Sequence, residues 1–189
     1  MLTSKANARR PGKAERMQAP DGGARTNGTF VLTRTFAAPR RRVWQAWSEA
    51  CEMQTWWGPK GCAIDVRRFE FRPGGFFHYA MQFADGPTLW GRFLYREIIA
   101  EQRIAWLNSF SNAGCGITRA PFDPAIPLEI LNEVRFDDDG PRTIVTLRAT
   151  PHGAEPHETA TFEGMFASLG EGYGGTFDRL EQSLATVRA

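Results

Sequence analysis

The chain has 189 residues, of which 42% are apolar and 12% are aromatic. This length suits one domain with a substantial core and is short for two. No run of about eighteen apolar residues could cross a membrane, and the N-terminus lacks the apolar segment of a secretory signal. Cys51, Cys62 and Cys115 lie far apart without a CxxC pair, which argues against disulfides and zinc. We therefore expect a cytoplasmic protein.

Charge is unevenly distributed along the chain. Six basic and two acidic residues give positions 1–28 a net charge of +4, so the remaining positions sum to −2 within a total of +2. A near-neutral domain is unlike a nucleic-acid binder, whose basic residues lie on the folded face. We expect residues 1–28 to form a flexible basic arm. Residues 29–189 are expected to form one domain with no nucleic-acid partner.

The first predicted elements are a strand and two short helices. The strand, Thr29–Phe36, is rich in β-branched and aromatic residues. Pro39 suits the first turn of a helix, and apolar residues then recur at helical spacing through Trp47. A second short helix, Glu49–Trp56, is stopped by Gly58.

After these helices the apolar period changes from about 3.6 to 2, which indicates strands. Six further strands are predicted at Ala63–Phe71, Phe76–Phe83, Thr88–Ile98, Arg103–Phe110, Leu128–Phe136 and Thr143–Thr150. Most connections are too short for parallel crossovers, so neighbouring strands should be antiparallel. Residues 111–127, with three prolines and two glycines, form a long loop.

The C-terminal segment carries one apolar stripe with spacings of three and four residues. Its members are Phe162, Phe166, Leu169, Tyr173, Phe177, Leu180, Leu184 and Val187. This spacing predicts one helix of about 30 residues, roughly 45 Å long, with an apolar face. Burial drives that face onto the sheet. We predict an α+β fold with a curved seven-stranded antiparallel sheet, two short helices and one long C-terminal helix.

Several short motifs stand in a fixed order along these elements. They are FAAP at 36–39, VWQAW at 43–47, WWGP at 56–59, RPGGF at 72–76, EQRI at 101–104, GY at 172–173 and FDRL at 177–180. In this order they resemble the START-like, or SRPBCC (Bet v 1-like), superfamily. The closer resemblance is to its bacterial branch, related to the C-terminal domain of the activator of heat-shock-protein-90 ATPase.

The resemblance implies a helix-grip fold with a cavity between the sheet and the last helix. Three functions stay open. The first is binding of a small hydrophobic or aromatic molecule without covalent chemistry. The others are a polyketide cyclase- or dehydratase-like enzyme and a chaperone-associated protein-binding module. We favour the binding protein, which needs no cofactor and could form a homodimer, while a chaperone partner remains an alternative.

Aromatic residues around the predicted cavity supply most of the candidate ligand-binding set. Core packing accounts for part of it, but buried Trp and Tyr usually present a polar atom to a partner. Apolar walls with a few polar tips are typical of a small-molecule site. The predicted lining is Trp56, Trp57, Phe77, Tyr79, Met81, Trp90, Trp106, Phe110, Met165, Phe166, Leu169 and Tyr173.

No residue pattern indicates catalysis or metal binding. The GxGxxG-like run 170–175 lies inside the helical stripe and follows no strand, so we expect its glycines to widen the cavity. His78, His152 and His157 lack metal-ligand spacing, and the last two are expected in solvent. Among the carboxylates, Glu133 is the candidate acid or base to test. The enzyme hypothesis requires such a group inside the cavity with a perturbed pKa.

Overall fold

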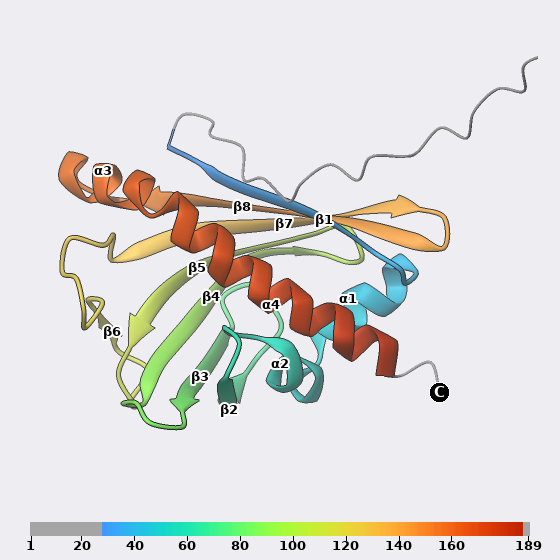
Figure 1. Cartoon of the computed structure of the whole chain (residues 1–189), viewed down its shortest axis with the longest axis horizontal. Coiled ribbons are helices and arrows are strands. Elements are labelled where there is room, and N and C mark those ends of the chain that lie inside the picture. Colours follow the sequence, from blue (N-terminus) through green and yellow to red (C-terminus); the bar gives the residue numbers. More distant parts are fainter. Residues whose placement is uncertain (1–27, 187–189) are drawn as a thin grey trace, which may run out of the picture.

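The computed structural model describes residues 28–186, which form a curved antiparallel sheet with helices packed on it (Figure 1). The strands are β1 (Phe30–Phe36), β2 (Cys62–Phe69), β3 (Phe76–Phe83), β4 (Leu89–Ile99), β5 (Arg103–Ser111), β6 (Ile117–Thr118), β7 (Glu129–Asp139) and β8 (Arg142–His152). The helices are α1 (Arg40–Ser48), α2 (Ala50–Trp56), α3 (Pro156–Gly164) and α4 (Phe166–Thr186).

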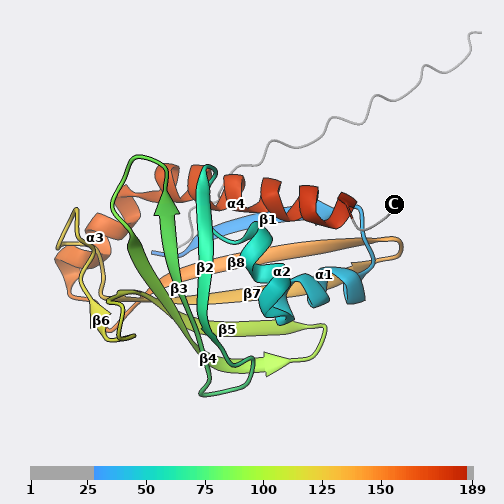
Figure 2. The ribbon, with the colours of Figure 1, turned by 90° about the horizontal axis from the view of Figure 1, so that it is seen from below.

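Seven strands pair antiparallel in the order β1-β8-β7-β5-β4-β3-β2. Figure 2 shows this sheet curving beneath α4. Bulges in β2 and β4 interrupt the pairing register, and such bulges bend a strand and increase its twist. The predicted α+β helix-grip class is confirmed. The short β6, which pairs with the end of β5, lies in the segment predicted to be all loop.

The predictions of a basic arm and of no membrane span can each be compared with the described residues. The predicted basic arm lies outside the described residues, except for Gly28. Within residues 28–186, the helices are all too short or too polar to span a bilayer.

The predicted unbroken C-terminal helix of about 30 residues is wrong, because the structure divides it into α3 and α4. Met165 lies between them with φ −88° and ψ 0°. Its amide donates to the Phe162 carbonyl at 3.1 Å, a tighter turn than the α-helix makes. Gly164 precedes this turn, where a residue without a side chain adapts easily. The apolar spacing continues from Phe162 to Phe166 across the break, so periodicity could not reveal it.

α4 packs on the domain unevenly along its length. The fully buried apolar residues all lie in its second half and are Phe177, Leu180 and Leu184. The Phe177 ring contacts Phe36 and Trp47, with ring centroids 5.6 and 6.5 Å apart. The apolar residues of its first half are only partly buried and are Phe166, Leu169 and Tyr173. The second half is therefore the more deeply buried part of the helix.

One arginine of α4 organises the segment that follows α2. The Arg179 guanidinium donates hydrogen bonds to the backbone oxygens of Thr55, Gly58, Pro59 and Cys62 at 2.9–3.3 Å. Carbonyls at a helix end lack partners within the helix, and a planar guanidinium can serve several of them together. Arg179 therefore fixes this segment to α4.

We expect Arg179→Lys to lower the free energy of unfolding by about 1–3 kcal/mol, the scale of losing hydrogen bonds to a charged group. An ammonium group cannot reach the same carbonyls from one position. Urea unfolding at neutral pH measures the change, with Arg148→Lys, at an exposed position of β8, as the control. Equal stability of the two variants would contradict this role of Arg179.

Candidate functional site

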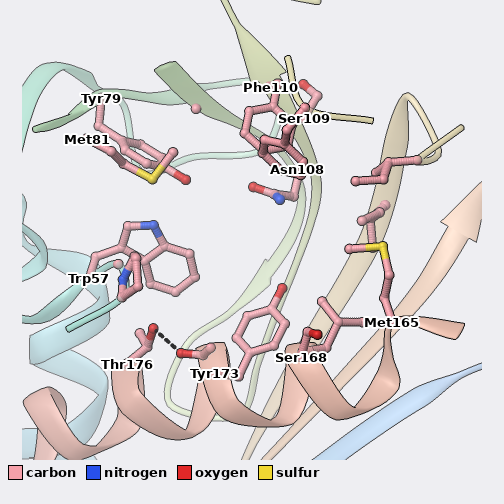
Figure 3. Close-up of a pocket in the computed structure, with 18 residues that line it drawn as sticks. Trp57, Tyr79, Met81, Asn108, Ser109, Phe110, Met165, Ser168, Tyr173 and Thr176 are labelled. Carbon is pink, nitrogen blue, oxygen red and sulfur yellow. Dashed lines mark hydrogen bonds between the residues drawn. The ribbon is translucent and has the colours of Figure 1, made fainter. Parts of the chain in front are cut away.

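A cavity of about 320 Å³ lies between the sheet and the first half of α4 (Figure 3). Strands β3, β4, β5 and β7 supply one wall, and α4 supplies the facing wall. The segment after α2 and the loop before β7 also contribute residues. The hollow therefore lies where α4 is only partly buried.

Seven residues of the predicted lining meet at this cavity. They are Trp57, Tyr79, Met81, Phe110, Met165, Leu169 and Tyr173. In Figure 3, Tyr79 and Phe110 project from the strands, while Tyr173 rises from α4 on the facing side. Strand alternation and the helical stripe together brought these residues into the predicted set.

Five residues of the predicted lining lie elsewhere. Trp56, Phe77 and Trp106 have no exposed surface and belong to the packed core. Gly91, the next residue of β4, lines the cavity. Because successive residues of a strand point to opposite faces, the side chain of Trp90 lies on the other face of the sheet. Phe166 packs edge-on against a phenylalanine ring of β1. The structure does not place these five at the cavity.

Eleven lining residues were outside the predicted set. They are Gly58, Pro59, Gly91, Asn108, Ser109, Phe122, Ile126, Ile130, Ser168, Gly172 and Thr176. Alternation could have found Asn108, which lies two residues from Phe110 on the same strand. Phe122 and Ile126 belong to the loop before β7, where no period indicates direction. Phe122 is 64% exposed, yet its ring meets Phe110 with centroids 5.5 Å apart.

Gly91 makes room for the ring of Tyr79. A Cβ atom at Gly91 would lie only 2.6 Å from the Tyr79 Cζ and Oη atoms, closer than side-chain atoms approach. The two residues are paired across β3 and β4. Burial raises the pKa of the Tyr79 phenol, and a hydrogen bond with Trp57 offsets only part of this effect. The phenol therefore stays protonated and neutral.

The glycine run of α4 contributes to the cavity through one residue. Gly172 lines the cavity, and a Cβ built there meets nothing within 4 Å. Gly170 and Gly174 are equally unobstructed but do not line it. Gly172 thus fits the expected widening, whereas its two neighbours in the run do not.

A buried hydrogen bond ties α4 to β7 behind the cavity. The Tyr173 hydroxyl donates to Oδ1 of Asn132 at 2.9 Å, and Asn132 is fully buried. Asn132 in turn donates from Nδ2 to the Ile130 carbonyl at 3.2 Å. Burial raises the pKa of Tyr173, so this second phenol is also neutral.

Within residues 28–186, the lining includes no Asp, Glu, His, Lys or Arg. Glu133 lies on the opposite face of the sheet, where its carboxylate meets Arg103 at 2.8 Å. His78 also points away from the cavity, and its Nε2 lies 3.1 Å from the Asn112 carbonyl. Burial lowers the pKa of His78. Neither candidate acid or base therefore faces the hollow.

Metal-ligating side chains are dispersed in the described part of the chain. Residues 28–186 hold no group of three or more His, Cys, Asp or Glu that could coordinate an ion. His152 and His157 are exposed, as predicted. Cys62 is buried, while Cys51 is exposed and Cys115 is half-buried; all three are free.

An ion pair holds the loop at the cavity rim. Arg119 donates to the Glu158 carboxylate of α3 and to the carbonyls of Pro124 and Ile126 at 3.1 and 3.3 Å. Glu158 is 4% exposed and also accepts the Glu155 amide at 2.9 Å. This backbone hydrogen bond, followed by Arg119, lowers the pKa of Glu158. The rim loop is thus tied to the helix that leads into α4.

A curved antiparallel sheet that encloses a cavity with a long C-terminal helix defines the helix-grip class, also called SRPBCC or Bet v 1-like. Residues 37–185 match the model of one family in this class, described as Activator of Hsp90 ATPase homolog 1-like protein. The chain belongs to this family. Among curated proteins, no match to the chain is found.

Solved structures of bacterial proteins share the fold. A protein from Arthrobacter aurescens superposes with a TM-score of 0.70 at 23% identity, covering 84% of this chain and 86% of that one. A protein from Nitrosomonas europaea superposes with a TM-score of 0.67 at 25% identity, covering 85% of this chain and 96% of that one. The AHSA1 protein from Silicibacter pomeroyi superposes with a TM-score of 0.64 at 15% identity, covering 84% of this chain and 98% of that one. At such identities the likeness establishes the fold and leaves the occupant of the cavity open.

We expect Gly91→Ala to cost about 1–3 kcal/mol of stability, because the new methyl group overpacks the wall against Tyr79. In a Tyr79→Leu background the same substitution should cost much less, since the ring is gone. A double-mutant cycle measured by urea unfolding gives the coupling between the two sites. If the free-energy costs of Gly91→Ala and Tyr79→Leu simply add in the double variant, the contact between the two residues is contradicted.

Proposed function

We propose that this chain binds a small hydrophobic or aromatic molecule in the cavity, without covalent chemistry. The observation that supports the proposal is an apolar hollow of about 320 Å³ inside an otherwise packed aromatic core. Protein interiors are close-packed, and atoms that line a void lose dispersion contacts. A ligand that fills the hollow restores those contacts.

The proposed binding is driven by burial of apolar surface. Enclosing roughly 250 Å² of apolar ligand surface contributes about 6 kcal/mol before the costs of association. The wall is already formed by tightly packed rings, such as Trp57 and Phe93 with centroids 4.9 Å apart. A preorganised wall lowers the ordering cost of binding.

The two alternative functions receive less support from the site. A cyclase- or dehydratase-like enzyme needs an acid or base in the cavity, and the titratable side chains of its described lining are two tyrosines with raised pKa values. A chaperone-associated module, suggested by the family description, needs an exposed apolar patch. The large exposed apolar residues of the described part are Ile99, Ile117, Phe122 and Leu128. Of these four, Phe122 lines the cavity and packs against Phe110, so its exposure does not require a protein partner.

We expect Gly172→Leu to weaken binding of the neutral probe N-phenyl-1-naphthylamine by about tenfold or more, a change of roughly 1.4 kcal/mol. The new side chain enters the cavity from α4. Gly174→Leu is the matched control, because it makes the same helix-favouring change at an unobstructed position outside the lining. Fluorescence titration compares the three proteins.

Three results would count against the proposal. Failure of the wild-type chain to bind a panel of neutral aromatics and lipids would end it. Equal weakening by both leucine variants would show that the probe binds elsewhere. A chaperone pull-down that succeeds with both variants, while no small molecule binds, would support the protein-binding module instead.

A further inference from the structure

The cavity offers no partner for an ion. Its described lining has no ionised side chain, and both of its phenols stay neutral, since burial raises their pKa values. Moving a charged group from water into such a site is costly unless an opposite charge meets it. The enclosed part of any ligand is therefore uncharged.

Two asparagines on neighbouring strands face α4, and their hydrogen bonding differs. Asn132 on β7 is satisfied by Tyr173 and by a backbone carbonyl. Asn108 on β5 stands opposite Ile130, which also lines the cavity. The Oδ1 atom of Asn108 is buried and has no hydrogen-bond partner among the described residues. Buried polar atoms are normally paired, so Asn108 lacks the hydrogen-bond partner that the side-chain oxygen of Asn132 has.

The amide of Asn108 projects into the hollow in Figure 3. The Tyr79 hydroxyl and the Trp57 indole nitrogen face the same space from the other side. The lining near Met165 and Leu169 is mainly apolar, with the Ser168 hydroxyl beside them. The cavity therefore has a more polar region at one end and a mainly apolar region at the other, which would orient an amphipathic ligand.

We infer that the ligand is a compact, uncharged hydrophobe with a hydroxyl or amide group that hydrogen-bonds to the side-chain amide of Asn108, which lines the cavity. A volume of about 320 Å³ lies at the small end of ligand pockets, which suits a molecule of up to about three rings. This inference rests on the proposed function and adds the polarity and orientation of the ligand to it.

Three naphthalene derivatives of similar shape test the inference at pH 7. We expect 2-naphthol to bind about tenfold more tightly than naphthalene, and 2-naphthoate to bind about tenfold more weakly than 2-naphthol. In Asn108→Leu, which keeps the side-chain shape, the preference for 2-naphthol over naphthalene should disappear. Naphthalene affinity should rise in this variant, since an apolar side chain replaces an unpaired amide at the wall. Competition with a neutral fluorescent probe measures all affinities.

The ligand-free proteins provide a second measurement. We expect Asn108→Leu to raise the melting temperature by roughly 2–4 °C, because it removes an unpartnered buried polar group. Asn132→Leu is the contrasting variant and should lower the melting temperature, because Tyr173 loses its acceptor. A destabilised Asn108→Leu protein would show a structural role for this amide and would overturn the inference.

The outcomes separate this inference from the proposed function. Binding of naphthalene and 2-naphthol with equal affinity, or tight binding of 2-naphthoate, overturns the inference and leaves a hydrophobic binding site in place. Persistence of the 2-naphthol preference in Asn108→Leu overturns it as well. If the wild-type chain binds none of the three, the proposed function itself is contradicted.

Discussion

The deeper burial of the second half of α4 determines where the cavity lies. Phe177 is buried against Phe36 and Trp47, and Arg179 fixes the segment after α2 through four backbone carbonyls. The first half of the helix lacks an equivalent buried row and spans the curved sheet. The first half is tied to the sheet by the Tyr173–Asn132 hydrogen bond, and the partly buried side chains beside this tie leave the space beneath the helix open.

The walls of this space resist collapse because their rings are already packed against one another. Phe93 contacts both Trp57 and Trp106, with centroids 4.9 and 4.7 Å away, so the lining ring of Trp57 is supported by packed core rings. Where side chains would close the space, the chain has Gly91 and Gly172. Aromatic packing and missing side chains thus act together to keep the hollow open.

The sequence predicted the elements whose periodicity is strong. Strand alternation and the stripe of α4 placed Tyr79, Phe110 and Tyr173 on facing walls. Periodicity could not reveal the break at Met165, because the apolar spacing continues through it. Nor could it assign Phe122, which lies in a loop that is positioned by an ion pair between distant segments. Asn108 was outside the predicted lining, which was defined by aromatic and large apolar side chains.

A ligand can enter the space beneath α4 only if that space stays open in the folded protein. A crystal structure determined under xenon pressure tests it most directly, because xenon enters apolar cavities that water leaves empty. We expect xenon, or a molecule that has remained bound, among Phe110, Ile130 and Leu169. A structure in which Phe122 and Met165 have folded inward to fill this space, with no density between sheet and helix, would contradict it.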